Sequence, residues 1–207
     1  MLEAKSIGYG YSGRWVFRNL NLQISEGEVV GLSGNSGCGK TTMAKVLAGY
    51  MEPSEGAIKV MEKSMDKTAT GRAHPVQLIW QHPEQTVNPT WKLSKLLEEA
   101  GHSDSDLMEQ LHIDPQWLSR YPHELSAGQL QRFCLLRALL TNPSYVLADE
   151  ATAMLDTVTQ LELWKLLLKL AEVRGIGILA ISHDSYLLDR ISTRRLQFSE
   201  LTQHIFS

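Results

Sequence analysis

The feature that most constrains this chain is a glycine-rich run at residues 34–41, GNSGCGKT. An apolar stretch at residues 28–33 precedes it and predicts a buried strand, and residues 42–47 follow with a helical pattern. The run fits the spacing G-x-x-x-x-G-K-[ST], typical of a loop that turns its backbone N–H groups toward phosphate oxygens. A glycine-rich turn without a ligand is the alternative, but the complete match between a strand and a helix favours a phosphate loop.

The residue types of this loop suit the binding of a nucleotide. The glycines let the backbone wrap, and the N-terminus of the following helix adds the positive end of its dipole. Lys40 would reach the β- and γ-phosphates of ATP, and the hydroxyl of Thr41 would bind Mg²⁺. The predicted nucleotide-binding residues of this segment are Gly34, Asn35, Ser36, Gly37, Cys38, Gly39, Lys40, Thr41 and Thr42.

A pair of acids, Asp149 and Glu150, follows a second apolar run at residues 144–148. A carboxylate at this place can hold Mg²⁺ opposite a phosphate loop, and we expect this of Asp149. Glu150 could then polarise the attacking water as a general base. Acids commonly end strands at a solvated sheet edge, so the pair has weight only because the same chain carries a phosphate loop.

The apolar runs alternate with helical patterns and predict an α/β fold with a mostly parallel sheet. A third run, residues 177–181, also ends in polar residues, as parallel strands that deliver side chains to one sheet edge do. Helices are expected at residues 129–140 and 157–173. Asp156 is placed to cap the second helix. The apolar stripe of this second helix is predicted to be Leu161, Trp164, Leu168 and Ala171.

The segment from about residue 83 to 122 differs from its surroundings. It is rich in proline, tryptophan, histidine and acids, shows no strand pattern, and contains a helical pattern at residues 93–100. We therefore expect one domain, residues 1–207, whose core is formed by residues 1–82 and about 123–207. A small helical lobe, about residues 83–122, would be inserted between the two parts of the core.

A third motif, Leu125-Ser126-Ala127-Gly128-Gln129, opens the helix at residues 129–140. Ser126 and Gln129 have the spacing of a capping box, so a well-capped helix is one interpretation. The motif also closely resembles the LSGGQ signature of ATP-binding cassette (ABC) ATPases, and it stands about twenty residues before the acidic pair. With the three motifs in this order, nearly the whole chain resembles an ABC nucleotide-binding domain, which implies a P-loop NTPase core and an N-terminal antiparallel β part.

The resemblance implies roles for further residues. Tyr11 lies where the family places an aromatic side chain that stacks on adenine, with Tyr9 less well placed. Gln81, after a strand-like lead-in at residues 76–80, occupies the position of a glutamine that touches the metal and water and links the lobe to a membrane partner. Asp156 matches a loop that crosses the dimer, and His183 matches a histidine that binds the γ-phosphate. The signature residues Ser126, Ala127, Gly128 and Gln129 would cover the ATP of a second subunit.

Some positions depart from the commonest family pattern. Ala127 replaces a signature glycine, Ala151 stands where proline is usual, and Met154 replaces an alanine. None of these changes removes a chemical group, so ATP hydrolysis is still expected. The lobe is somewhat shorter than usual, and the chain ends soon after His183, which implies that the C-terminal regulatory domain of some relatives is missing.

Composition limits the class of protein. The 207 residues carry a formal net charge of −3, so no overall basic field predicts a nucleic-acid partner. Cys38 and Cys134 form neither a disulfide framework nor a zinc pattern, and the remaining histidines lack metal-ligand spacing. Those histidines are His74, His82, His102, His112, His123 and His204. Without a signal-peptide core or an apolar run of about 20 residues, we expect a cytoplasmic protein that reaches the membrane through other chains.

Several short stretches resemble the ATPases of peptide and nickel importers. They are residues 81–83 with 87–89, 121–125, 148–150, 158–160 and 181–184. The resemblance implies two membrane permeases, an external solute-binding protein, and a homodimer or a pair with a second ATPase. A soluble ABC ATPase acting on nucleic acid or the ribosome is the alternative, but such relatives usually carry coiled-coil insertions or two cassettes. A non-hydrolysing cassette is disfavoured because Glu150 and His183 are both present.

Overall fold

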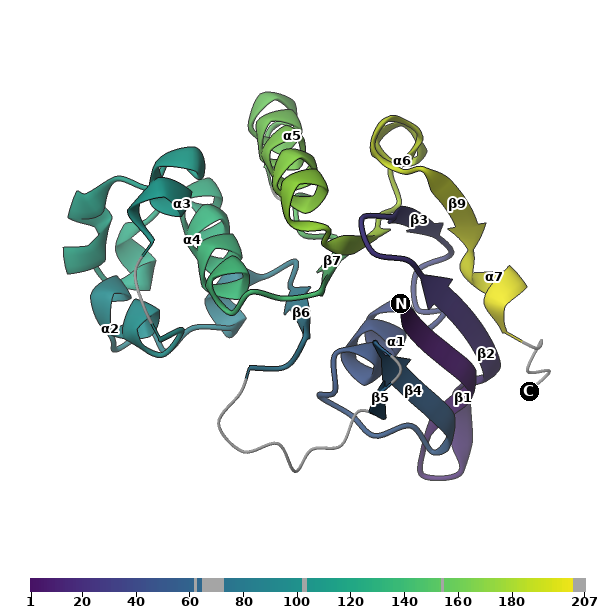
Figure 1. The fold of residues 1–207 in the computed structure, drawn as a ribbon. Helices are drawn as coiled ribbons and strands as arrows, with labels where there is room; N and C mark the ends of the chain where they lie inside the picture. Colours follow the sequence, from purple (N-terminus) through teal and green to yellow (C-terminus); the bar gives the residue numbers. More distant parts are fainter. Residues whose placement is uncertain (62, 65–72, 102–103, 154, 203–207) are drawn as a thin grey trace.

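A five-stranded parallel sheet forms the centre of the chain in the computed structural model, which describes residues 1–61, 63–64, 73–101, 104–153 and 155–202 (Figure 1). Its strand order is β6-β7-β8-β3-β9. The strands are β3 (Val29–Ser33), β6 (Val76–Ile79), β7 (Tyr145–Asp149), β8 (Gly177–Ile181) and β9 (Arg194–Gln197). The predicted strands are therefore confirmed within a residue of their ends. Met154, His102 and His204 lie outside the described residues.

The strand register brings the ends of three strands to one edge of the sheet. Ile181 pairs with Asp149 on β7 and with Leu32 on β3. All neighbouring strands of this sheet pair in parallel, so these strands point the same way. The residues that follow β3, β7 and β8 consequently meet at the carboxyl edge, which is where an open α/β sheet binds its ligands.

A second, antiparallel sheet lies beside the first and has the order β2-β1-β4-β5. Its strands are β1 (Leu2–Tyr11), β2 (Arg14–Ile24), β4 (Glu55–Val60) and β5 (Lys63–Ser64). β1 and β2 form a hairpin with alternating buried and exposed residues over much of its length. The N-terminal antiparallel part that the family resemblance implies is therefore confirmed.

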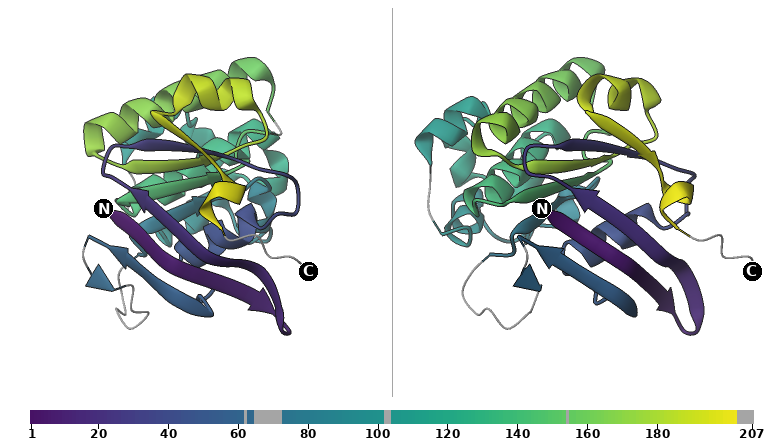
Figure 2. Two further views of the ribbon diagram at one scale, coloured as in Figure 1. Left: turned by 90° about the vertical axis from the view of Figure 1, so that its right-hand side faces the viewer. Right: turned by 45° about the vertical axis from the view of Figure 1, so that its right-hand side comes forward.

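Helices cover the two faces of the parallel sheet (Figures 1 and 2). On one face, Val30, Leu32 and their neighbours pack with α1 and the antiparallel sheet. On the other face, alternate residues such as Val29 and Ile178 pack with α4, α5 and α6. The helices are α1 (Lys40–Leu47), α4 (Ala127–Leu140), α5 (Thr157–Arg174), α6 (Ser185–Ile191) and α7 (Phe198–Leu201). Because both faces of the central strands are buried, their sequences are apolar throughout.

The predicted stripe on α5 is only partly correct. Trp164 and Ala171 are buried, but Leu161 and Leu168 are only half-buried. The other buried residues of the helix are Leu163, Leu167 and Leu170. Leucines occur on several sides of α5, so the spacing of apolar residues does not determine which row faces the core. The packing of α5 on the sheet and on α4 determines it.

The segment between β6 and α4 is helical in its described part. It contains η1 (Pro83–Gln85), α2 (Leu93–Glu98), α3 (Ser105–Gln110), η2 (Pro115–Ser119) and η3 (Pro122–Glu124). The predicted helix at residues 93–100 is thus shorter, and α3 was not predicted. Buried leucines of α2 and α3 share one apolar cluster with Phe133 of α4. Figure 1 shows α2 and α3 grouped with α4 to one side of the sheet.

Candidate nucleotide site

The loop after β3 has a backbone that requires glycine at two positions. Gly37 and Gly39 adopt positive φ values of 76° and 111°, and Gly39 is the residue that precedes α1. A Cβ atom on Gly39 would lie 2.9 Å from Cγ1 of Val16 on β2. Only glycine combines this conformation with so close a neighbour. The loop is therefore held tightly against the β1–β2 hairpin, and its N–H groups lead directly into the N-terminus of α1.

Lys40 lies at the centre of this loop rather than in solvent. Its side chain is buried, and Nζ donates hydrogen bonds to the carbonyl oxygens of Gly34 (2.8 Å) and Asn35 (2.9 Å). Sγ of Cys38 is 3.9 Å from the same nitrogen. These contacts keep a positive charge inside the ring of loop backbone, so an anion bound by the loop N–H groups would also meet the ammonium group.

Asp149 is a buried carboxylate at the end of β7, with a relative exposure of 6%. Burial raises the pKa of Asp149, and the nearby Glu150 raises it further. A hydrogen bond from the Thr41 hydroxyl and the charges of Lys40 and Lys45 act in the opposite direction but do not cancel the shift. The structure therefore brings together Thr41 and Asp149, the two residues predicted to bind Mg²⁺. The Asp149 carboxylate is shielded from water there, and a bound cation would stabilise its charge.

Glu150 and His183 meet at the same edge, from neighbouring strands. The backbone N–H of Glu150 donates to the carbonyl of Ile181 (3.0 Å), and Glu150 adopts a φ of 49°, which is uncommon for a residue other than glycine. Its Oε1 lies 2.9 Å from Nε2 of His183, and the two side chains are 22% and 45% exposed. Both side chains are thus partly open to solvent at this edge, where a ligand could contact them.

Gln81 is half-buried and lies two residues beyond the end of β6, the strand next to β7. The carbonyl of Trp80, its neighbour, accepts a hydrogen bond of 3.3 Å from Nε2 of the buried Gln131 on α4. The Trp80 ring also lies 4.9 Å below Nζ of Lys45. These contacts, which were not predicted, connect the segment before Gln81 to α4 and to α1. The sequence feature that could have revealed the Gln131 contact is a polar residue on a face of the helix that is otherwise apolar.

The signature motif forms an exposed helix N-terminus. Oγ of Ser126 accepts from the backbone N–H of Gln129 (3.2 Å), and Oε1 of Gln129 accepts from the N–H of Ser126 (2.9 Å). The predicted capping box is confirmed. Ala127 is helical and is not among the residues with positive φ, so alanine is tolerated there. Ser126 and Ala127 are exposed, and Gly128 and Gln129 partly so, which leaves this helix end open to another molecule.

Tyr11 and Asp156 are also on the surface. Tyr11 ends β1, is 51% exposed, and contacts the Tyr9 ring at 5.0 Å and Sδ of Met51 through its hydroxyl. It belongs to the hairpin whose Val16 packs on Gly39 of the phosphate loop. Asp156 is confirmed as the N-cap of α5, since its carboxylate accepts from the N–H groups of Val158 and Thr159.

The remaining histidines have ordinary contacts where the structure describes them. Nδ1 of His74 lies 2.8 Å from the carbonyl of Val76, His82 pairs with Glu84, and His123 stacks on Tyr121. Among the described residues, no group of three or more His, Cys, Asp or Glu side chains is arranged to hold a metal ion.

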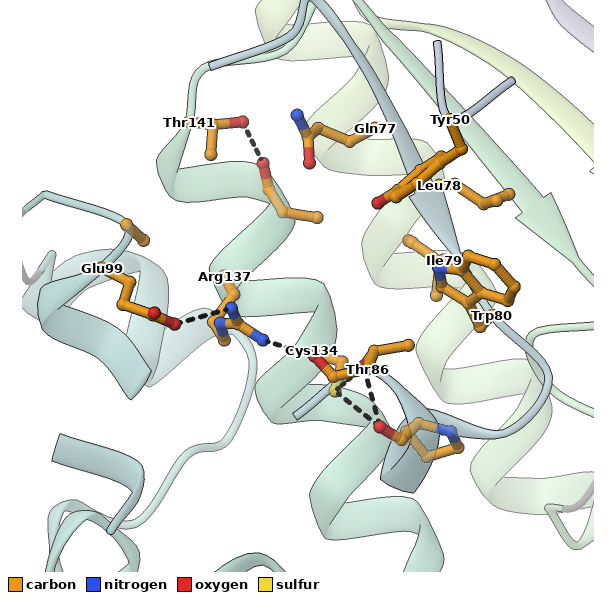
Figure 3. A pocket seen from close by; sticks show the side chains of 13 residues that line it. Tyr50, Gln77, Leu78, Ile79, Trp80, Thr86, Glu99, Cys134, Arg137 and Thr141 are labelled. Carbon is orange, nitrogen blue, oxygen red and sulfur yellow. Dashed lines mark hydrogen bonds and ion pairs between the residues drawn. The ribbon is translucent and has the colours of Figure 1, made fainter. Parts of the chain in front are cut away.

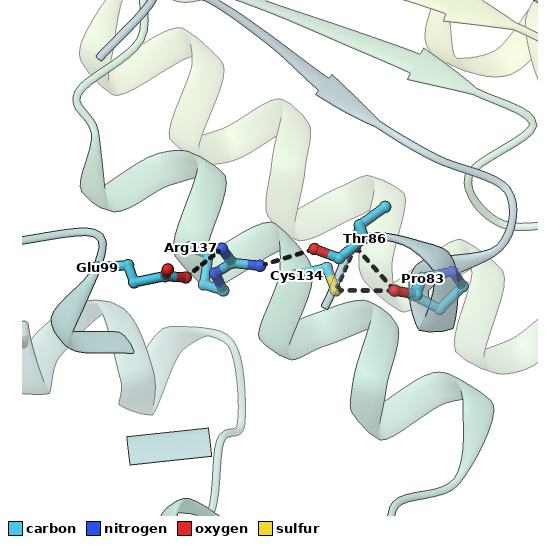
Figure 4. Close-up of polar contacts among 5 residues, drawn as sticks. All are labelled: Pro83, Thr86, Glu99, Cys134 and Arg137. Carbon is cyan, nitrogen blue, oxygen red and sulfur yellow. Dashed lines mark hydrogen bonds and ion pairs between the residues drawn. The ribbon is translucent and has the colours of Figure 1, made fainter. Parts of the chain in front are cut away.

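A pocket of about 180 Å³ lies beside the segment that leads to Gln81, between β6, η1, α2 and α4 (Figure 3). Arg137 of α4 crosses it, and its guanidinium donates to the carbonyl of Thr86 (3.3 Å) and to Glu99 (3.4 Å) (Figure 4). Nε of Arg137 is buried and has no partner among the described residues. Cys134 lies next to Thr86, and burial raises the pKa of its thiol. The pocket therefore joins the strand before Gln81 to the helix that begins at the signature motif.

Known proteins resemble this chain in sequence and in fold. Residues 17–153 match the family model described as ABC transporter. The nickel import system ATP-binding protein of Staphylococcus aureus is 32% identical over 209 residues, which cover 94% of this chain and 84% of that protein.

Solved structures show the same fold. An ATP-binding subunit of an ABC transporter superposes with a TM-score of 0.83 at 24% identity, covering 95% of this chain and 85% of that one. A dimeric ATP-binding cassette in a post-hydrolysis state with ADP and phosphate gives a TM-score of 0.80 at 24% identity, covering 95% and 94%. This chain belongs to the ABC transporter family, as an ATP-binding ATPase domain.

Proposed function

We propose that this chain hydrolyses MgATP as the motor subunit of a membrane importer, closing as a dimer around the nucleotide. The observation that carries the proposal is the edge cluster, defined as Lys40, Thr41, Asp149, Glu150 and His183, which three strands bring together at the end of the parallel sheet. An ammonium group, a hydroxyl, two carboxylates and an imidazole at one edge are the groups that phosphoryl transfer to water requires.

Each member of the edge cluster has a role that follows from its surroundings. Lys40 and the loop N–H groups bind the β- and γ-phosphates. Thr41 and Asp149 would hold Mg²⁺, together with Gln81 from the segment after β6, and the ion would supply neutralisation of charge on the phosphate oxygens. Glu150 accepts the proton of the attacking water, and His183 donates a hydrogen bond to the γ-phosphate. Tyr11 stacks on adenine.

The exposed signature motif completes the site from a second subunit. Ser126 and Gly128 lie at the N-terminus of α4, where N–H groups and the helix dipole favour an anion. Seated on the γ-phosphate of a partner subunit, this helix end would exclude water and strengthen the electrostatics of the site. Asp156, at the start of α5, would lie at the same interface. Loss of the γ-phosphate then removes the contact that holds the dimer closed.

Import of a small solute, either a peptide or nickel in a complex, is the transport function we propose. The support is the 32% identity to the nickel import ATP-binding protein and the short stretches shared with peptide and nickel importers. None of the helices formed by the described residues is long and apolar enough to cross a bilayer. Two permease subunits would carry the solute across the membrane, supplied by an external binding protein, and would hold this chain at the inner face. The second ATPase would be another copy or a sister chain.

The division of the chain follows from this function. We propose a single ABC domain over residues 1–207, with the edge cluster on the core (residues 1–82 and about 123–207) and a helical subdomain at about residues 83–122. The pocket crossed by Arg137 lies where the two parts meet. A permease segment docked in this pocket would contact both β6, the strand before Gln81, and the signature helix α4. Closure of the dimer would thereby be transmitted to the permease.

The substitution Glu150→Gln tests the catalytic role. The amide keeps the size and the contact with His183 but cannot accept a proton, so we expect unchanged ATP binding and a loss of turnover of about 10²-fold or more. The variant should accumulate as a dimer in MgATP, measured by light scattering. Glu84→Gln, which leaves the edge cluster intact, is the control. A Glu150→Gln protein that hydrolyses ATP at the wild-type rate would contradict the assignment.

A second experiment tests the transport function. The tagged chain is isolated from gently solubilised membranes of its host, and the co-purifying proteins are identified by mass spectrometry. Two polytopic membrane proteins are the expected result. Recovery of ribosomal proteins or DNA-repair factors instead, with the chain in the soluble fraction, would overturn the import proposal and leave the ATPase chemistry standing.

A further inference from the structure

Apart from tyrosine and tryptophan, the polar or charged side chains buried in the part of the chain that the structure describes are Lys40, Gln131, Asp149 and Thr152. The proposed mechanism uses Lys40 and Asp149, and Gln131 binds the strand before Gln81. Thr152 is left without a role. It is 5% exposed and stands two residues after the general base, Glu150. Burying a hydroxyl costs free energy unless it is hydrogen-bonded, so its contacts show what it holds in place.

The Thr152 hydroxyl is bound twice by α5. Oγ1 accepts from Nε1 of Trp164 at 3.0 Å and from Nε2 of Gln160 at 2.9 Å. The Gln160 amide also reaches the carbonyl of Thr152 at 3.4 Å. Trp164 is itself buried and packs in the apolar cluster on the α5 side of the sheet. Thr152 is therefore fastened to a helix that cannot move without opening that cluster.

The backbone around Thr152 transmits this anchoring to Glu150. The carbonyl of Glu150 accepts from the N–H of Ala153 (3.0 Å), and the carbonyl of Thr152 accepts from the N–H of Leu155 (3.1 Å). Glu150 itself has the unfavourable φ of 49°. A residue with positive φ keeps that conformation only where its surroundings impose it. Two contacts hold Glu150 in this conformation. Before Glu150 it is the hydrogen bond to Ile181 of β8, and after Glu150 it is the turn that Thr152 fastens to α5.

We propose that Thr152 is a positioning residue for ATP hydrolysis: its hydroxyl, held by Trp164 and Gln160, fixes the turn after Glu150 and so keeps the general base in its strained conformation. The inference rests on the proposed function of Glu150. Thr152 touches neither nucleotide nor water and acts only through Glu150. The same turn leads into Asp156, so one anchor sets the positions of both the base and the start of α5.

Thr152→Val separates this role from simple packing, because valine has nearly the same shape and lacks the hydroxyl. The cavity beside Thr152 has a volume of about 10 Å³, at the lower limit for a water molecule that could replace the lost acceptor. In the nucleotide-free protein, we expect amide hydrogen exchange at Ala153 and Leu155 to accelerate by about tenfold or more, since a tenfold change follows from a small loss of local stability. Thr152→Ser should restore the wild-type protection.

Kinetics supply the second measurement. In single-turnover hydrolysis of MgATP, Thr152→Val should lower the rate by about 10- to 100-fold, as displacements of a catalytic group by about 1 Å do. The Kd for ATP should stay within about threefold, because the phosphate loop is untouched, and Thr152→Ser should recover the rate. Leu170→Ala is the matched control: it opens the same buried face of α5 away from the turn.

The outcomes are distinct. Wild-type exchange and turnover in Thr152→Val would overturn the inference, and so would equal losses in Leu170→Ala at matched thermal stability, which would reduce Thr152 to a packing residue. A wild-type protein that fails to hydrolyse ATP would count against the proposed function instead. The exchange rates at Ala153 and Leu155 would then still decide whether Thr152 fixes the turn.

Discussion

Two aspartates that lie close together in the sequence, Asp149 and Asp156, have opposite surroundings in the structure. Asp149 is buried at the end of β7, and burial raises its pKa. Asp156 is exposed at the N-terminus of α5, where hydrogen bonds from the Thr159 side chain and from the N–H groups of Thr159 and Val158 lower its pKa. The charge of the first carboxylate destabilises the free protein, and the second carboxylate stabilises a helix.

This contrast predicts opposite effects of removing each charge. A raised pKa means that the folded state binds the proton of Asp149 more tightly than the unfolded state does. The loss of stability caused by the Asp149 charge is therefore complete above the folded pKa, and it shrinks and vanishes as pH falls from there to the unfolded pKa. Asp149→Asn should therefore raise the melting temperature of the nucleotide-free protein near pH 7, at about 2–4 °C for each kcal/mol gained, and the gain should disappear in acid. It should also remove the stabilisation by MgATP.

Asp156→Asn is the counterpart. Because the pKa of Asp156 is lowered in the folded state, its charge stabilises the fold above the unfolded pKa, and this stability is lost as pH falls through the folded pKa. The substitution should therefore lower the melting temperature near neutral pH and not in strong acid. Thermal melting of both variants between about pH 2 and 8, which extends below the ordinary pKa of an aspartate, checks the pair. A destabilised Asp149→Asn at pH 7 would contradict the account of Asp149 as a carboxylate that lacks solvation.

At the scale of the element, α4 serves two purposes with one structure. Its C-terminal part is buried, with Phe133, Leu136 and Leu139 in the larger apolar cluster. Its N-terminus is exposed and closed by the Ser126–Gln129 capping box. The box satisfies the helix end of the free subunit, and we propose that the same end binds the γ-phosphate of the partner. Folding and dimerisation therefore place different demands on Ser126.

Ser126→Asp separates the two demands. Aspartate caps helices as well as serine does, and a negative charge is favourable at a helix N-terminus, so the melting temperature should be unchanged or slightly higher. The same charge should repel the γ-phosphate of a partner subunit. In the Glu150→Gln background, we expect the MgATP-dependent dimer to be lost, by light scattering, while Ser126→Asn retains it at least in part. Normal dimers in Ser126→Asp would show that this helix end does not face ATP.

At the scale of the whole molecule, contacts join three regions that hydrolysis must coordinate. Trp80 receives Gln131 from α4 and Lys45 from α1, directly before Gln81. The pocket crossed by Arg137 lies against the same strand. The helix that follows the phosphate loop, the signature helix and the proposed docking pocket therefore all contact one short segment. A permease seated in the pocket could respond to nucleotide without contacting it.

Charge reversal in the pocket tests the docking proposal. Glu99→Arg replaces the partner of Arg137 with a second cation at the pocket, and we expect co-purification with the membrane subunits to fall by more than about tenfold. ATP binding should be unchanged. Glu109→Arg, on the exposed side of α3, is the matched control and should assemble normally. Equal recovery of the membrane subunits by both variants would place their docking surface elsewhere.

Prediction from sequence was accurate where the relevant contacts are local. The Ser126–Gln129 box and the Asp156 cap are bonds between residues two or three apart, and both formed as predicted. The strand at residues 177–181 was exact, because a fully buried strand is an uninterrupted apolar run. β9 was missed because it is an exposed edge strand whose sequence, RRLQ, carries almost no apolar signal.

By itself, the sequence determined the strand, loop and helix that make the phosphate site, the caps of α4 and α5, and the family. Tertiary structure alone decided that Asp149 lies by Thr41, that Glu150 meets His183, that Trp164 binds Thr152, and which face of α5 is buried. The physical reason is range. Caps and glycine turns depend on neighbours along the chain, whereas these contacts join residues from different strands and helices, and only the packing of the sheet and its helices brings them within reach.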